Sequence, residues 1–260
     1  MPGMQFSRAI VRPPGPTFAQ GITTAALGAP DLDLALDQHA RYCDALRRCG
    51  LEVTVLEPEA NFPDAPFVED TAVVAGSHAI VTRPGAPSRS GEFAAIERTL
   101  RPMVAAFSHI EAPGTLDGGD VCDAGDTLYV GISQRTNAEG ARQFATIVEV
   151  LGYRAVTLDV RDVEGALHLK SAMSYLGDGT FVAAGELASR LGVECGRILP
   201  VDPEEAYAAN CVRVNDYVLF PVGYPRLQAR IADAGFTPLL LDVSEYRKMD
   251  GGLSCLSIRL

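Results

Sequence analysis

The chain has 260 residues, of which 47% are hydrophobic and 21% charged, an ordinary globular composition that can form one sizeable core. Its net charge of −11 argues against nucleic acid or an anionic membrane as the partner, and its six cysteines include no Cys-x-x-Cys pair, which argues against a zinc or redox motif. Because the N-terminal segment lacks a signal-peptide apolar core and no apolar run can span a bilayer, we expect a cytoplasmic protein. We also expect a single domain over residues 1–260, with no metal and no cofactor.

The first helix is predicted to begin at Asp31 and to end before Gly50, because apolar residues recur there at a spacing of three to four. An alternating strand is predicted directly afterwards, over residues 51–56. A second such helix is predicted between residues 136 and 152, since its opening sequence Thr-Asn-Ala-Glu is typical of a capped helix start. Another strand follows over residues 154–158, so helix and strand alternate along the chain.

Five segments share one design, in which a polar entry leads into a strand, a tight turn and a second strand. Four of them occupy residues 68–82, 116–131, 167–184 and 209–221. The fifth begins at Gly251 and has no chain left for its second strand, which the N-terminal residues 6–12 can supply. The entries are 41 to 51 residues apart, with a helix and a further strand in each interval. This pattern predicts a ring of five α/β units; an irregular α/β sheet with coincidental spacing is the alternative.

Residues able to do chemistry stand at the entries of these units. Glu69 and Asp70 open the first unit, Asp117 opens the second, and His168 opens the third. In the fifth, two glycines precede Cys255, and the alternating residues that follow predict a strand that anchors this thiol in the core. If the ring forms, its entries converge on one axis, which would gather carboxylates, an imidazole and a thiol.

This set of groups is suited to attack on a guanidinium carbon. A thiol becomes a thiolate near neutral pH with help from a neighbour, usually a protonated histidine, and His168 is the one histidine at an entry. Paired buried acids require a cationic partner, and a planar guanidinium fits two acids through bidentate hydrogen bonds. The thiolate would add to the guanidinium, and the histidine would protonate the departing amine and then activate water. The sequence contains no Ser-His-Asp elbow, phosphate loop or dinucleotide fingerprint.

Seven segments that together span almost the whole chain carry a family resemblance. They are residues 62–70 (FPDAPFVED), 82–89 (TRPGAPSR), 116–121 (LDGGDV), 135–137 (RTN), 167–171 (LHLKS), 207–211 (YAANC) and 244–255 (SEYRKMDGGLSC). The chain resembles the dimethylarginine dimethylaminohydrolases of the guanidino-group-modifying, amidinotransferase-like superfamily. The resemblance implies an α/β fold, a five-bladed propeller of ββαβ units closed by the N-terminal strand. It also implies a small-molecule substrate, Nω-methylated arginine, hydrolysed to citrulline and a methylamine through a covalent thiouronium-type intermediate on a cysteine.

The resemblance also implies a role for individual residues. Cys255 would be the nucleophile, His168 the general acid and base, and Asp117, where some relatives have Glu, the acid that supports them. Glu69 and Asp70 would hold the guanidinium or its supporting network. Asp64 and the backbone at Ile22 would bind the α-amine, and Arg89 and Arg135 would bind the α-carboxylate. The backbone at Met249 would line the site beside Cys255. The loop over residues 20–23 is a candidate lid.

Two alternatives remain from the sequence. The close one is an arginine deiminase or amidinotransferase, but those relatives carry an acid two residues after the catalytic histidine, where this chain has Lys170. Losing that acid leaves fewer acceptors and more room, which suits a methylated nitrogen. The other alternative is a non-catalytic module that binds a cationic amino acid. Whether the protein is a monomer or a homodimer, and whether zinc inhibits at a Cys-His-Asp cluster, stays open.

Overall fold

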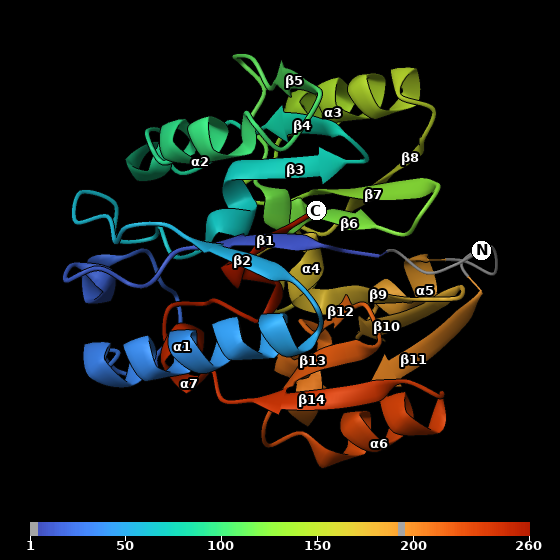
Figure 1. Ribbon diagram of the computed structural model, residues 1–260. Coiled ribbons are helices and arrows are strands. Elements are labelled where there is room, and N and C mark those ends of the chain that lie inside the picture. The colour runs from blue at the N-terminus through green and yellow to red at the C-terminus, as the bar shows by residue number, and fades with distance from the viewer. Residues whose placement is uncertain (1–4, 192–195) are drawn as a thin grey trace.

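The structure, a computed structural model, describes residues 5–191 and 196–260 and contains five three-stranded sheets (Figure 1). In each sheet the first two strands are antiparallel, and a helix joins the second strand to a parallel third. The strands are β1 (Arg8–Val11), β2 (Glu52–Val55), β3 (Ala72–Ala75), β4 (His78–Val81), β5 (Ala106–His109), β6 (Val121–Asp123), β7 (Thr127–Ile132), β8 (Arg154–Asp159), β9 (Met173–Gly177), β10 (Thr180–Ala184), β11 (Arg197–Val201), β12 (Val212–Val214), β13 (Tyr217–Pro221), β14 (Thr237–Leu241) and β15 (Ile258–Arg259). The connecting helices are α1 (Leu32–Arg48), α2 (Phe93–Leu100), α3 (Ala138–Val150), α5 (Leu187–Arg190) and α6 (Pro225–Asp233), and two short helices, α4 (Leu169–Ala172) and α7 (Ser244–Arg247), lie outside this pattern.

The two ends of the described chain meet in one sheet. Strand β15 pairs antiparallel with β1, with Ala9 opposite Arg259 and Ile10 opposite Ile258, and β1 pairs parallel with β2. First strands of successive units also contact one another, as β15 does with β3, β6 with β9, and β9 with β12. The predicted propeller of ββαβ units and its closure by the N-terminal strand are therefore confirmed.

The two helices predicted in most detail form as expected. Helix α1 begins after Asp31, whose carboxylate accepts a hydrogen bond from the Leu34 N–H at 3.0 Å. Helix α3 begins after Asn137, whose side chain accepts from the Gly140 N–H at 2.8 Å. Their apolar sides face the sheets, and α1, α2, α3 and α6 lie on the outside of the molecule in Figure 1.

The unit entries lead into strands as predicted, but the entries themselves are not extended. Each strand begins later, after a tight helical turn: Val68–Thr71, Gly118–Asp120, α4, Pro203–Ala209 and Ser254–Leu256. In an extended strand, consecutive side chains point to opposite faces. A tight turn instead lets neighbouring polar residues approach the ring axis together before the chain extends. Cys255 accordingly lies in such a turn rather than in a strand.

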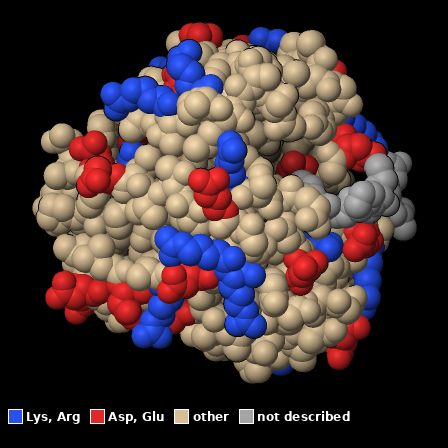
Figure 2. Space-filling view, viewed as in Figure 1, with Lys and Arg blue, Asp and Glu red and all other residues tan. Residues whose placement is uncertain are grey.

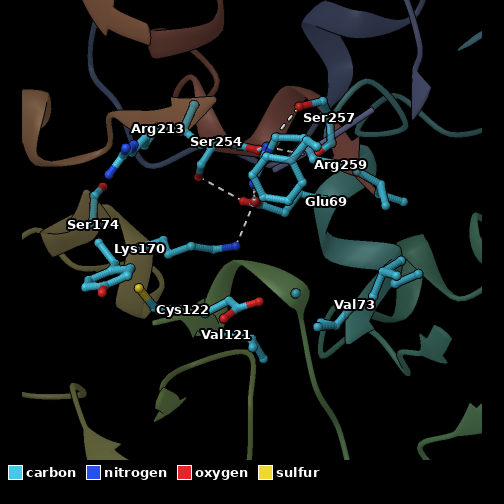
Figure 3. Close-up of a pocket in the computed structure, with 18 of the residues that line it drawn as sticks. Glu69, Val73, Val121, Cys122, Lys170, Ser174, Arg213, Ser254, Ser257 and Arg259 are labelled. Atoms are coloured by element: carbon cyan, nitrogen blue, oxygen red, sulfur yellow. Dashed lines mark hydrogen bonds and ion pairs between the residues drawn. The ribbon is translucent and has the colours of Figure 1, made fainter. Parts of the chain in front are cut away.

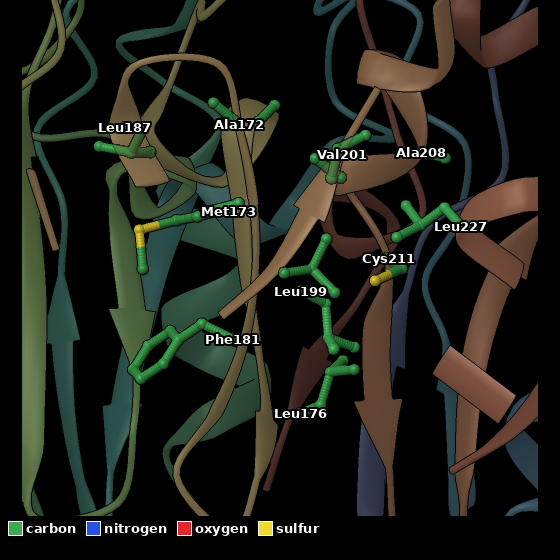
Figure 4. Close-up of a cluster of buried hydrophobic side chains, with 14 of the residues drawn as sticks. Ala172, Met173, Leu176, Phe181, Leu187, Leu199, Val201, Ala208, Cys211 and Leu227 are labelled. Carbon is green, nitrogen blue, oxygen red and sulfur yellow. The ribbon is translucent and has the colours of Figure 1, made fainter. Parts of the chain in front are cut away.

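The interior consists of four hydrophobic clusters. Figure 4 shows part of the largest, where Met173 and Phe181 of one unit lie near Leu199, Cys211 and Leu227. Cys211 is buried and free, as are Cys43, Cys49 and Cys122, and such thiols pack as small hydrophobic residues; Cys195 lies outside the described residues.

The surface carries both signs of charge. On the face in Figure 2, acidic and basic side chains lie next to one another rather than in single-sign patches. Many exposed pairs are ion pairs, such as Arg190 with Asp162 at 2.7 Å, and these contribute little stability. None of the helices in the described ranges is long and apolar enough to cross a bilayer.

Candidate active site

Asp117 and His168 form the acid–imidazole pair of the site. His168 directly precedes α4, Asp117 directly precedes its tight turn, and His168 Nε2 lies 3.1 Å from Asp117 Oδ2. Both side chains are buried. The other carboxylate oxygen of Asp117 accepts a hydrogen bond from the Gly85 N–H at 2.8 Å, which fixes the orientation of the acid. Asp117 can therefore hold the ring in one orientation and stabilise its protonated form.

Two further carboxylates surround this pair. Asp70 accepts hydrogen bonds from Arg89 at 2.6 Å and from the Gly119 N–H at 2.9 Å. Burial opposes the protonation of His168, but the negative charges of Asp70, Asp120 and Asp117 outweigh it and raise the pKa of His168 to about 9. At neutral pH the imidazole therefore carries a proton that it can donate.

Asp120 positions His168. It is fully buried, and one oxygen accepts from the Leu169 N–H at 2.8 Å, at the first residue of α4. The other accepts from the hydroxyls of Ser133 and Thr136 at 2.6 and 2.7 Å. Since Leu169 is the next residue after His168, Asp120 fixes the backbone from which the imidazole projects.

We expect the protonated His168 to stabilise the fold in a pH-dependent way. Its folded pKa of about 9 lies above the unfolded value of about 6.5, so the stabilisation is complete below pH ~6.5 and is lost as the pH rises through 9. Between pH 6.5 and 8.5, the free energy of unfolding of the wild type should fall relative to that of His168→Gln by up to about 1.4 kcal/mol per pH unit. Urea unfolding of both proteins across this range measures the difference, and a pH-independent difference would contradict the expectation.

Cys255 lies in the tight turn before β15 and is almost inaccessible, with 8% of its surface exposed. Burial, followed by the negative charges of Glu69 and Asp70, raises the pKa of this thiol to about 12. From the sequence, His168 was expected to be the neighbour of the thiol. In the part of the chain that the structure describes, the side chain within hydrogen-bond distance of the sulfur is instead that of Asn210, with Nδ2 at 3.9 Å. The thiol is therefore protonated at neutral pH until a positive charge arrives.

Glu69 lines a small cavity of about 110 Å³ on the ring axis (Figure 3). One of its oxygens is 2.7 Å from Lys170 Nζ and 2.9 Å from Arg259 Nη2. The other accepts a hydrogen bond from the Ser254 hydroxyl at 2.8 Å, next to Cys255. Two cations therefore neutralise Glu69, which places it in the network that supports the turn.

Asp64 and Ile22 meet at another edge of the site. The Ile22 N–H donates to Asp64 Oδ1 at 3.0 Å, and a side chain at Gly21 would lie only 3.1 Å from the Met249 methyl group. The next residues of the loop also bind the segment around Met249, since the Thr23 hydroxyl donates to the Lys248 carbonyl at 2.9 Å. The loop containing Ile22, which was suggested as a lid, is therefore closed against this segment.

The two arginines expected at the α-carboxylate differ in their surroundings. Arg89 is buried and donates to Asp70, to Glu92 and to the carbonyls of Asp64 and Phe67, which leaves at most one Nη1 donor for a ligand. The Arg135 guanidinium has no hydrogen-bond acceptor among residues 5–191 and 196–260 and is partly exposed. Of the two, Arg135 is the one with its donors available.

A larger hollow of about 1040 Å³ adjoins these residues. Its wall includes residues 24–27 of the loop, Leu167, which precedes His168, and Asn210 and Gly252 near the thiol. Asn210, whose side chain contacts the Cys255 sulfur, forms part of the wall of this hollow.

Asp70, Asp117 and His168 place one potential ligand atom each within 4.8 Å of one another, a spacing that could hold a metal ion. A histidine must lose its proton before it can bind a metal, so the raised pKa of His168 disfavours a metal there at neutral pH. This cluster also differs from the Cys-His-Asp set considered from the sequence.

Comparison with known proteins places the chain in a family. The family model described as "N,N dimethylarginine dimethylhydrolase, eukaryotic" matches residues 30–191. An N(G),N(G)-dimethylarginine dimethylaminohydrolase of Pseudomonas aeruginosa is 44% identical over 98% of this chain and 99% of its own.

Two solved structures are similar over the whole fold. The P. aeruginosa enzyme, as a cysteine-to-serine mutant complexed with citrulline, has a TM-score of 0.95 at 43% identity and covers 99% of this chain and 100% of its own. A dimethylarginine dimethylaminohydrolase with a histidine-to-glycine change, as an adduct with S-methyl-L-thiocitrulline, has a TM-score of 0.94 at 43% identity over 98% and 100% of the two chains. The chain therefore belongs to the dimethylarginine dimethylaminohydrolase family.

Proposed function

We propose that this protein hydrolyses Nω-methylated arginine to citrulline and a methylamine. The observation that carries the proposal is that a buried thiol and a protonated imidazole both interact with the charge of Asp70, in a chain whose relatives carry the name of this activity. A relative of this fold holds the product citrulline, and another forms an adduct with S-methyl-L-thiocitrulline.

The reaction requires two proton transfers at His168. The guanidinium of the substrate brings positive charge to Asp70 and Cys255, which lowers the raised pKa of the thiol, and the thiol proton passes to solvent. The thiolate adds to the guanidinium carbon, and the bond from that carbon to the methylated nitrogen breaks as His168 donates its proton to the departing amine. The neutral imidazole then takes one proton from water as the water oxygen attacks the thiouronium carbon, the carbon–sulfur bond breaks, and the second water proton passes to the departing sulfur. Citrulline and the free enzyme result.

The remaining residues divide between the two ends of the substrate. Asp70 lies beside His168 and faces the reacting group, whereas Glu69 acts through Ser254 and the turn that carries Cys255. At the far end, Asp64 with the Ile22 backbone would bind the α-amine. Arg135, with the remaining Nη1 donor of Arg89, would bind the α-carboxylate. The backbone at Met249 would line the site beside Cys255.

Lys170 supports a methylated substrate over free arginine. An acid at this position would add an acceptor for an unmethylated nitrogen, whereas Lys170 points to Glu69 in the axial cavity and offers none (Figure 3). Burying an unmethylated N–H of arginine without an acceptor would cost more free energy than fitting a methyl group in the same place. The site should therefore prefer the methylated compounds.

A citrulline assay on the purified protein tests this function. Asymmetric dimethylarginine and monomethylarginine should both yield citrulline, with kcat/KM higher than that for free arginine by at least about tenfold. Turnover of free arginine equal to or above that of the methylated compounds would favour an arginine deiminase. No turnover of any of the three would leave a binding module.

A further inference from the structure

Asn210 opens the fourth unit of the ring and is the one polar entry residue that the reaction above does not use. It is buried and directly follows the helical turn Pro203–Ala209. Its Oδ1 accepts a hydrogen bond from the Ser254 N–H at 3.0 Å, and its Nδ2 lies 3.9 Å from Cys255 Sγ. Because the Ser254 N–H can only donate, the oxygen of the amide must face it, and the NH2 group must face the sulfur.

The surroundings of Asn210 hold this amide in place. A side chain at Gly252 would come within 2.5 Å of Asn210 Cγ, so the amide packs directly on bare backbone. From the other side, the Ser174 hydroxyl lies 2.6 Å from the carbonyls on either side of Asn210, those of Ala209 and Cys211. The Asn210 Nδ2–H can therefore donate to the Cys255 sulfur without any rearrangement.

The charges around the sulfur make such a donor valuable. The negative charges of Glu69 and Asp70 oppose the ionisation of the thiol. An amide N–H interacts weakly with a neutral thiol but forms a charge-assisted hydrogen bond to a thiolate, which is shorter and about twice as strong. The contact with Asn210 therefore gains strength as Cys255 loses its proton, and it opposes the effect of the two acids.

We propose that Asn210 is a catalytic residue that stabilises the thiolate of Cys255. When the thiol releases its proton to solvent, the Nδ2–H donates to the sulfur that now bears the negative charge, and Oδ1 keeps the turn at Ser254 in register. The same donor faces the sulfur again when the carbon–sulfur bond of the intermediate breaks. This inference rests on the proposed function only in taking Cys255 as the nucleophile.

Alkylation of Cys255 by iodoacetamide tests the proposal without turnover. The sulfur–carbon bond forms, the carbon–iodine bond breaks, and the thiol proton goes to the buffer, so the rate reports the thiolate. The rate at Cys255 is followed by mass spectrometry of its peptide, because the chain has other thiols. Loss of the donor in Asn210→Ala should raise the thiol pKa by about one unit. At pH 8 this change lowers the fraction of thiolate about tenfold, while each thiolate becomes about threefold more nucleophilic. The net rate of alkylation should therefore fall about threefold.

Asn210→Asp provides the second variant, because it keeps an oxygen for the Ser254 N–H and replaces the donor with a negative charge. Alkylation should be slower than in Asn210→Ala, and kcat for methylated arginine should fall more than KM changes. Ser174→Ala is the matched control: it loosens the same segment, and it should lower Tm without changing the pH dependence of alkylation.

The proposal would be overturned if both Asn210 variants had the alkylation profile of the wild type. It would also be overturned if Ser174→Ala slowed alkylation as much as the Asn210 variants do. Slowed alkylation in a protein that turns over no methylated arginine would support the role of Asn210 and reject the proposed function, so the two failures can be told apart.

Discussion

Cys255→Ser should abolish citrulline formation while methylated arginine still binds. A serine hydroxyl is a far weaker nucleophile than a thiolate, so turnover should fall at least about 10³-fold. The groups proposed to grip the substrate, including Asp64 and Arg135, stand on other elements and are unchanged. The dissociation constant for asymmetric dimethylarginine, measured by calorimetry, should therefore stay within a few-fold of the KM of the wild type.

The control for this variant is Cys49→Ala, which removes a buried thiol at the end of α1, away from the site. It should keep wild-type turnover. If Cys255→Ser retained more than a few per cent of the activity, another group would have to be the nucleophile. If it lost binding as well as turnover, the thiol would serve recognition and the covalent mechanism would lack support.

His168→Gly should stop turnover of methylated arginine yet still react covalently with S-methyl-L-thiocitrulline. A dimethylamine cannot leave without a proton, and His168 is the protonated group beside the site, so kcat should fall at least about 10³-fold. Methanethiol leaves as a thiolate without that proton. The Cys255 sulfur would form its bond to the amidine carbon as the bond to the methylthio group breaks. With no base to activate water, the adduct should accumulate.

Intact-protein mass spectrometry, followed by peptide mapping to Cys255, measures this adduct. A histidine-to-glycine relative of the same fold was obtained as an adduct with this compound. His78→Gln is the control, because His78 contacts Ser108 on a partly buried strand remote from the axis and should leave turnover unchanged. Rapid release of citrulline from the His168→Gly adduct would show that another residue activates water.

The ring could be predicted because its signal is local. Each unit repeats a polar entry, a turn and a strand, and the chain-order spacing of these features is visible in the printed sequence. The pairing of β1 with β15 could also be predicted, because the fifth unit needed a partner strand. The backbone at the entries could not, since Val68–Thr71 contains residues that suit a strand, and the turn forms because tertiary contacts bury Glu69 and Asp70 together.

The site was harder to predict where it depends on distances between units. Asp117 and His168 stand out by type and position, and their contact is what a ring of entries would produce. Asp120 and Asn210 act through hydrogen bonds to the backbone of other units, and Arg259 acts through an ion pair with Glu69 of another unit. No pattern within a single segment shows such contacts. Asn210 did carry a signal, its place at a unit entry. An amide, however, lacks the charge that marked the other entries as reactive.

The sheet formed by β15, β1 and β2 differs from the other four in the number of residues that separate its two antiparallel strands along the chain. In those four sheets the antiparallel pair is a hairpin of a few residues, whereas Ala9 meets Arg259 across nearly the whole sequence. Loop-closure entropy grows with the logarithm of loop length, which makes this pairing costlier by about 3 to 4 kcal/mol than a hairpin of about four residues. The unit that carries the nucleophile is thus the one least able to form by itself. The free energy gained by folding the other four units, and by the contacts of β15 with β3, must offset this entropy cost. The position of the Cys255 thiol therefore depends on the whole ring being folded.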